Sequence, residues 1–339
     1  MELTDQPQPK FVPDRNLKLM DQVRQVLQYH HYAYRTEQAY CGWIVRFIKF
    51  HGSNTHPSKM GQLELDSFLS HLAVKGKVSA ATQRQAMNAL IFLYQRVLDI
   101  EVEGQLEPVK AKKRKALPVV MTQDEVHAVL SAMHRKHKLM AGLLYGGGLR
   151  LMECIRLRIN DLDFARNQIY IRGAKGGKDR LTLFPHSIKE QLRAQVDTVK
   201  VLHDEDLGLG YGQTIIPDAL ARKYSSAARE FIWQFVFPSR KLSQDPRSGV
   251  FRRHHVFESG LQKAVRKAVL QSGINKRISC HTFRHSFATH LLENGVNIRI
   301  VQELMGHTSV KTTEIYTQVM ERDLSKLQSP LDVLVHSST

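Results

Sequence analysis

Cysteine is scarce in this chain, and long hydrophobic runs are missing. The three cysteines, Cys41, Cys154 and Cys280, lie far apart among 339 residues, so the sequence predicts neither a disulfide framework nor a four-thiolate zinc site. No apolar stretch reaches the roughly 18–20 residues of a membrane helix, and residues 1–10 contain no apolar core of a signal peptide. We therefore expect a cytoplasmic protein that neither spans a membrane nor is secreted.

The sequence also lacks internal repeats and low-complexity tracts. Hydrophobic residues make up 42% and charged residues 24%, which is an ordinary balance for a protein with hydrophobic cores and argues against a mainly disordered chain. A length of 339 residues corresponds to about two domains of the usual size.

Positive charge is in excess, and the excess lies almost entirely in one part of the chain. The formal net charge is +17. Residues 1–108 hold 12 basic and 11 acidic residues, whereas residues 109–339 hold 37 and 21. Such asymmetry favours a partner with dense negative charge, most often nucleic acid. A soluble basic protein with solvated faces is the simpler alternative.

Residues 17–108 have the periodicity of a small helical bundle. Apolar side chains recur at spacings of three and four, which predicts helices over residues 17–34, 36–50, 63–74 and 80–98. Residues 1–16, with three prolines, are expected to form a loose leader. Residues 109–117 predict a basic linker that is either a solubilising tether or a contact for a phosphate backbone; its cations include Lys112, Lys113 and Arg114.

Residues 118–323 predict a second domain. Thr122 and Glu125 have the spacing of a capping box, and alternation around a Lys/Gly turn predicts a β-hairpin from residues 168–172 and 180–184. Residues 205–255 fit no simple pattern. The predicted fold is mainly α-helical with a small β-hairpin or sheet, in two domains followed by a tail over residues 324–339. Further helices are expected near residues 188–204, 260–272, 281–294, 298–304 and 312–320.

Two histidines and an arginine stand close together at His281, Arg284 and His285. On a helix, positions three apart share a face, so His281 and Arg284 would point into one site. A guanidinium and an imidazole suit phosphate oxygens there. His281 and His285 could instead be a metal pair, but no Glu follows His281 and no third ligand is evident. We therefore expect no metal.

Other polar residues stand near glycines or in turns. Arg150 follows three glycines at 146–148, which allow close backbone approach to a ligand, and Glu153 could brace it. Lys175 lies in the hairpin turn, which lacks the spacing of a Walker phosphate loop. Farther on, Tyr316 follows His307 by nine residues. Taken alone, a helical tyrosine is usually half-buried packing.

Together, six residues appear in the order and spacing of the tyrosine recombinase family, namely Arg150, Lys175, His281, Arg284, His307 and Tyr316. The chain resembles this family over nearly its whole length, and residues 17–108 resemble its SAM-like core-binding domain. The resemblance implies that Tyr316 attacks a scissile DNA phosphate and forms a 3′-phosphotyrosine. It also implies that Lys175 is the general acid for the 5′ oxygen, that the arginines and histidines stabilise charge, and that Lys178 touches backbone phosphate. No metal or other cofactor is implied, since guanidiniums can stabilise phosphoryl charge.

Residues 205–255 resemble the insertion of one subfamily, the integron integrases. The matching segments are 216–224, 233–239, 245–249 and 252–255. The resemblance implies that gene cassettes are integrated and excised at double-stranded attachment sites and at folded single-stranded hairpins, by a homotetramer in the bacterial cytoplasm at the nucleoid. Extrahelical bases are read by stacking, for which Trp233, His254 and His255 are candidates. A lone tryptophan is equally expected in the core, and the tail either docks on a neighbouring subunit or packs on its own.

Four other kinds of protein remain as alternatives. A recombinase of the Xer or phage type would act on double-stranded sites, and a type IB topoisomerase would use the same residues to relax supercoils. A non-enzymatic DNA-binding descendant would be expected to lose some of the six residues. A metal-dependent nuclease would need clustered carboxylates, which the sequence does not show.

Overall fold

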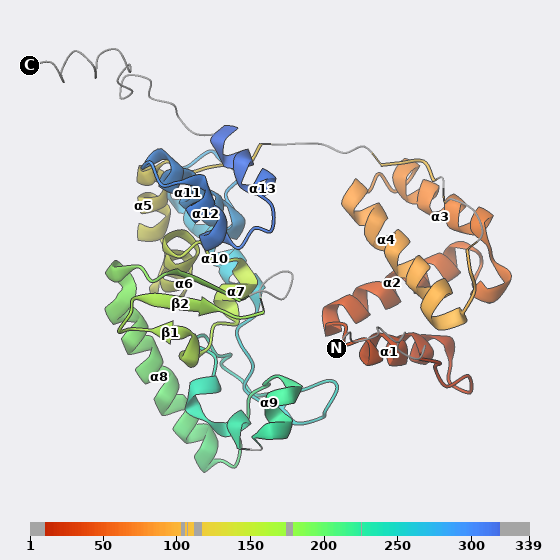
Figure 1. Ribbon diagram of the computed structural model, residues 1–339, viewed down its shortest axis with the longest axis horizontal. Coiled ribbons are helices and arrows are strands. Elements are labelled where there is room, and N and C mark those ends of the chain that lie inside the picture. The colour runs from red at the N-terminus through yellow and green to blue at the C-terminus, as the bar shows by residue number, and fades with distance from the viewer. Residues whose placement is uncertain are drawn as a thin grey trace, which may run out of the picture. The chain divides into compact units, whose positions relative to one another are not determined.

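The computed structural model describes residues 11–102, 106, 108–111, 117–173, 179–224 and 226–318. The chain divides into two compact units, residues 1–115 and 116–339, and each has its own hydrophobic core (Figure 1). Within the described residues, no helix is long and apolar enough to cross a membrane. The predicted tail over residues 324–339 lies outside them.

The first unit is a bundle of four helices. These are α1 (Leu19–Tyr29), α2 (Tyr34–Phe50), α3 (Gln62–Val74) and α4 (Ala80–Phe92), with a short 3₁₀ helix at Pro57–Lys59 and a π-helical segment, Leu93–Leu98, continuing α4. The apolar positions that predicted the helices form the core, with Ile44, Phe47 and Leu90 at most 1% exposed. The first predicted helix extends five residues too far at its C-terminal end, because the chain turns at His31, whose φ is +55°.

Part of the predicted leader is ordered against this bundle. The ring of Phe11 stacks on Tyr29 with centroids 4.1 Å apart. The guanidinium of Arg15 donates to the carbonyl oxygen of Val97 at 2.9 Å. The expectation of a loose leader is therefore wrong for residues 11–16, because an aromatic ring and an arginine there find partners on the bundle.

The second unit packs helices around a small antiparallel sheet. The sheet has the order β1 (Leu162–Asp163), β2 (Gln168–Ile171), β3 (Arg180–Leu183), and Gln168 pairs with Leu183. The hairpin was predicted, whereas the two-residue β1 was not. Around the sheet lie α5 (Gln123–Ser131), α6 (Arg135–Gly146), α7 (Leu151–Ile155), α8 (Lys189–Gly208), α10 (Glu258–Gln271), α11 (Cys280–Glu293), α12 (Ile298–Met305) and α13 (Lys311–Glu314).

Local sequence signals explain several of these boundaries. Thr122 and Glu125 form the predicted capping box at the start of α5, with Glu125 N–H donating to Thr122 Oγ1 at 3.2 Å and Thr122 N–H to Glu125 at 2.8 Å. The last predicted helix is shorter than expected, since α13 passes into a 3₁₀ segment, Ile315–Gln318. Gly306, with φ +60°, ends α12.

Residues 209–257 form an irregular region at the C-terminal end of α8 (Figure 1). The region contains α9 (Asp218–Lys223), two 3₁₀ turns (Ala227–Arg229 and Phe231–Trp233) and a two-stranded ribbon of β4 (Ser243–Gln244) and β5 (Phe251–Arg252). Arg253 fastens it to α8 through a bidentate ion pair with Asp206 at 2.5 and 2.6 Å. His203 on α8 adds a hydrogen bond to the carbonyl oxygen of Arg229 at 2.9 Å. Together with the buried side chains of Val236 and Phe237, these polar contacts hold a region that has no regular hydrophobic period.

Candidate active site

A glycine turn places Arg150 at the start of α7. Gly148 has φ +62°, and a Cβ there would lie 2.4 Å from the ring of Phe287 on α11. Only glycine therefore allows this turn to pack so closely on α11. Arg150 is the N-cap of α7, and its N–H donates to Glu153 at 2.8 Å.

Glu153 is the centre of a cluster of three arginines. Its carboxylate accepts from the guanidinium of Arg150 at 2.7 Å and from both terminal nitrogens of Arg180 at 2.9 and 2.6 Å. The guanidinium of Arg284 lies 3.8 Å away. Burial alone would raise the pKa of Glu153, but the hydrogen bonds and charges of Arg180 and Arg150 outweigh it and hold that pKa at about 2. The sequence predicted the brace on Arg150, and the structure adds Arg180.

Arg284 is buried on α11 and joins the turn at Gly148 to the end of α12. Its guanidinium donates to the carbonyl oxygens of Gly148 and Met305, and one terminal nitrogen lies 3.4 Å from Nε2 of His307. Burial and the nearby charge of Arg150 lower the pKa of Arg284 to about 9. His307 is held by Thr313, whose hydroxyl lies 2.9 Å from Nδ1. The arginine is thus fixed in a field that favours a bound anion.

Tyr316 lies beside these cations. Its side chain is 3% exposed, and its ring stacks near that of His307 with centroids 6.2 Å apart. Its hydroxyl lies 3.1 Å from Nδ1 of His285. Burial raises the pKa of Tyr316, while the charges of Arg284 and Arg150 lower it in part. His281, at the exposed start of α11, meets His285 edge-on at 4.8 Å between centroids.

The structure therefore brings four of the six sequence-predicted residues together beside Glu153. His281 lies at the edge of this group, where its ring contacts that of His285. The four are Arg150, Arg284, His307 and Tyr316. Lys175 and Lys178 lie outside the described residues, as do Lys112, Lys113 and Arg114. Sequence reasoning missed Arg180 and treated His285 only as a metal ligand. The described residues contain no group of histidine, cysteine and carboxylate side chains that could hold a metal ion.

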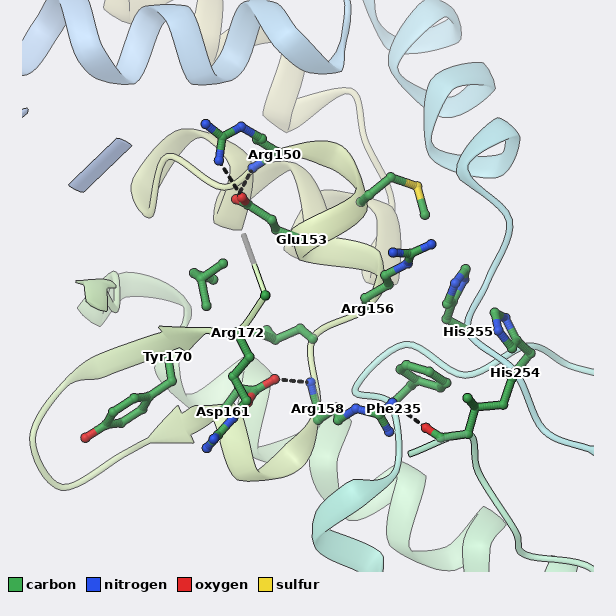
Figure 2. A pocket seen from close by; sticks show the side chains of 15 residues that line it. Arg150, Glu153, Arg156, Arg158, Asp161, Tyr170, Arg172, Phe235, His254 and His255 are labelled. Atoms are coloured by element: carbon green, nitrogen blue, oxygen red, sulfur yellow. Dashed lines mark hydrogen bonds and ion pairs between the residues drawn. The ribbon is translucent and has the colours of Figure 1, made fainter. Parts of the chain in front are cut away.

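A pocket of about 540 Å³ extends from Arg150 and Glu153 to the irregular region (Figure 2). Its wall includes Arg156 and Arg158 from the segment after α7, Arg172 from the end of β2, and Phe235, His254 and His255 from the irregular region. Arg158 connects the two sides. Its guanidinium stacks 4.5 Å from the ring of Phe235 and donates to the carbonyl oxygens of Trp233 and Ile215, the latter at 2.5 Å.

The three predicted base-stacking residues differ in their exposure. Trp233 and His254 are half-buried, and His254 lines the pocket. His255 is 9% exposed, packs 3.9 Å from the ring of His254, and its Nδ1 contacts the carbonyl oxygen of Val256 at 2.8 Å. Both rings line the pocket, but the more covered ring of His255 offers a base less face than that of His254, and stacking by His255 on DNA stays a prediction.

Family models match both units of the chain. Residues 119–322 match the phage integrase family, and residues 19–104 match the N-terminal SAM-like domain of phage integrases. An "Integrase/recombinase" from Escherichia coli is 44% identical over 322 residues, which is 95% of each chain. "Tyrosine recombinase XerA" from Thermococcus kodakarensis is 30% identical, covering 86% of this chain and 88% of its own.

Solved structures share the fold. The XerH site-specific recombinase in a post-cleavage complex with palindromic difH has a TM-score of 0.56 at 19% identity, over 91% of this chain and 83% of its own. The Tn1549 transposon integrase in complex with circular intermediate DNA has a TM-score of 0.57 at 16% identity, over 95% and 99%. The predicted two-domain, mainly helical architecture is confirmed. The chain belongs to the phage integrase family and is a site-specific tyrosine recombinase, an enzyme that breaks and rejoins DNA.

Proposed function

We propose that this recombinase is an integron integrase, which integrates and excises gene cassettes at double-stranded attachment sites and at folded single-stranded hairpins. The observation that carries the proposal is the irregular region, residues 209–257, which supplies the half-buried ring of His254 to a cation-lined pocket that begins at Arg150. A plane to stack on beside positive charge is what an extruded base with its phosphate requires. Four subunits on two paired sites would supply the four strand cleavages of an exchange.

Catalysis would use the cluster around Tyr316. The Oη of Tyr316 attacks the scissile phosphorus, the bond to the 5′ oxygen breaks, and Lys175 gives that oxygen its proton. Arg150 and Arg284, with His281 and His307, stabilise the charge on the non-bridging oxygens. The guanidiniums are fixed before the phosphate arrives, because Glu153 and backbone carbonyl oxygens hold them. The phosphotyrosine preserves the bond energy, so rejoining would need neither ATP nor metal.

The nucleophile is tested by Tyr316→Phe, which removes only the attacking oxygen. DNA binding should persist while the covalent protein–DNA adduct disappears. The matched control is Tyr145→Phe, which also removes a hydroxyl hydrogen-bonded to a histidine of α11, at 2.9 Å from His290, and should keep the adduct. An adduct formed by Tyr316→Phe would refute the assignment. An unchanged yield of adduct in EDTA is expected, and its loss there would favour a metal-dependent nuclease.

A substrate with a different leaving group distinguishes the proposed roles of the two lysines in the predicted hairpin turn. Lys175→Ala should block cleavage, and a substrate with a 5′-bridging sulfur should restore it, because a thiolate leaves without a proton. Lys178→Ala should weaken binding in a salt-dependent way. Rescue of Lys178→Ala but not of Lys175→Ala by sulfur would mean that the roles are reversed.

The integron assignment is tested with two hairpins that differ only in their protruding bases. Trp233→Ala and His254→Ala should each weaken binding to the hairpin with extrahelical bases by about 5- to 150-fold, the range for loss of one stacked base. Binding to the hairpin without them should change little. An equal loss of binding to both hairpins, together with a lowered melting temperature, would mean that Trp233 is a core residue. Recombination of double-stranded sites alone would favour a Xer-type enzyme, and relaxation of supercoils without recombination would favour a topoisomerase.

A further inference from the structure

His285 is the histidine that contacts the hydroxyl of Tyr316. Its Nδ1 lies 3.1 Å from Oη, and the two ring centroids are 5.4 Å apart. Within the described part of the chain, this is the one hydrogen bond recorded for that hydroxyl. It joins helix α11 to the 3₁₀ segment Ile315–Gln318, two segments far apart in the chain, so no local pattern predicts the contact.

The other histidines of the site are differently engaged. Nδ1 of His307 meets the hydroxyl of Thr313 at 2.9 Å, and its Nε2 faces the guanidinium of Arg284 at 3.4 Å. His281 meets the ring of His285 rather than the tyrosine. His285 is therefore the group placed to receive a proton from Tyr316.

The tyrosine needs such a partner. Burial raises its pKa, so the phenol keeps its proton until it attacks. Burial, followed by the charges of His281 and Arg284, lowers the pKa of His285 to about 4. A neutral imidazole has a free lone pair on one nitrogen. A bound phosphodiester would offset the charge of Arg284, which shifts the pKa of His285 back towards the range of an effective base.

We propose that His285 is a catalytic residue that exchanges the proton of Tyr316 during cleavage and rejoining. As the Oη–phosphorus bond forms and the bond to the 5′ oxygen breaks, the phenolic proton passes to Nδ1 of His285. In rejoining, the 5′ oxygen bonds to phosphorus, the Oη–phosphorus bond breaks, and the proton on Nδ1 of His285 returns to the tyrosyl oxygen. The inference rests on the proposed role of Tyr316 as nucleophile, which the Tyr316→Phe experiment tests independently.

The test compares two substitutions of His285. His285→Asn keeps a polar atom near the position of Nδ1 but cannot take a proton, whereas His285→Ala removes both the contact and the base. If His285 moves the proton, both variants should form the covalent adduct about 10²-fold more slowly or worse, the usual contribution of general acid–base catalysis. A normal rate of adduct formation in His285→Asn would mean that His285 only positions Tyr316. A normal rate in His285→Ala would overturn the proposal.

A second substrate separates proton transfer from a structural defect. A DNA strand ending in a 3′-p-nitrophenyl phosphate mimics the phosphotyrosine, and its leaving group departs as a stable anion without a proton. The double variant Tyr316→Phe with His285→Asn should join this strand to a 5′-hydroxyl as fast as the single variant Tyr316→Phe does. An equal loss on this substrate would mean that His285 only supports the site.

Helix α11 supplies a matched control. His290 also pairs with a tyrosine through Nδ1, at 2.9 Å from the hydroxyl of Tyr145, and its Nε2 meets the carbonyl oxygen of Met121 at 2.9 Å. His290→Asn should therefore lower the melting temperature and leave the rate of adduct formation, measured well below melting, unchanged. If His290→Asn lost as much rate as His285→Asn, both effects would come from the packing of α11, and the proposal would be refuted.

Discussion

Replacing Glu153 by glutamine should unfold the catalytic unit at a distinctly lower temperature. The substitution keeps the shape of the side chain and removes the one negative charge that Arg150, Arg180 and Arg284 share. The side chain of Glu153 is 10% exposed, so solvent screens these pairs weakly. The variant leaves three cations close together around a neutral amide.

The pKa of Glu153 sets the size of the effect. A fall from 4.5 to about 2 corresponds to about 3 kcal/mol by which the folded site favours the carboxylate. Losing one partner of a buried ion pair costs about 3–5 kcal/mol, which is the same range. For a unit of this size, about 2–4 °C of melting temperature accompanies each kcal/mol, so we expect a fall of roughly 6–12 °C.

The assay is thermal unfolding of the full chain, followed by adduct formation. Because the folded pKa is depressed, the stabilisation is present above pH 4.5 and is lost as the pH falls towards 2. The difference between wild type and Glu153→Gln should shrink in the same window. Glu190→Gln is the control, since its pair with Arg193 is exposed on both sides and should contribute little. A melting temperature for Glu153→Gln within error of that control would refute the reasoning.

Three further predictions concern the fold around the site. Gly148→Ala should cost about 1–3 kcal/mol of unfolding free energy, because the new Cβ meets Phe287. The control Gly173→Ala should cost less, because Gly173 also has a positive φ but has open space around it. Equal losses of stability in the two variants would mean that backbone strain alone causes the effect. Arg158→Met should speed proteolysis within residues 209–257, since it frees the carbonyl oxygens of Trp233 and Ile215; an unchanged cleavage pattern would show that Arg253 and His203 hold the region without Arg158. Burial, with nearby positive charge, lowers the pKa of His255, His285 and His307 from 6.5 to about 4. The unfolded chain therefore binds more protons between these values, and urea stability should fall as the pH is lowered through that range; flat stability there would contradict this.

Sequence reasoning succeeded where the structure depends on near neighbours. The period of three and four over residues 36–50 predicted α2, and the alternation around residues 168–184 predicted the β2–β3 hairpin. The capping box of Thr122 and Glu125 marked the start of α5. Sequence reasoning failed across residues 205–255, because this region has little regular secondary structure and is held both by polar anchors such as Arg253 with Asp206 and by isolated buried side chains such as Phe237.

By itself, the sequence determined the architecture of two domains, the family resemblance and the six residues around which catalysis is proposed, because each depends on local periodicity or on motif spacing. Only the tertiary structure decided which side chains meet. Arg180 reaches Glu153 across 27 positions, His285 reaches Tyr316 across 31, and Arg158 reaches Trp233 across 75. It also decided that His254 and His255 both line the pocket and that His255 is the more covered of the two. Burial, hydrogen-bond partners and shifted pKa values arise from contacts between distant segments, and no local pattern in one chain encodes them.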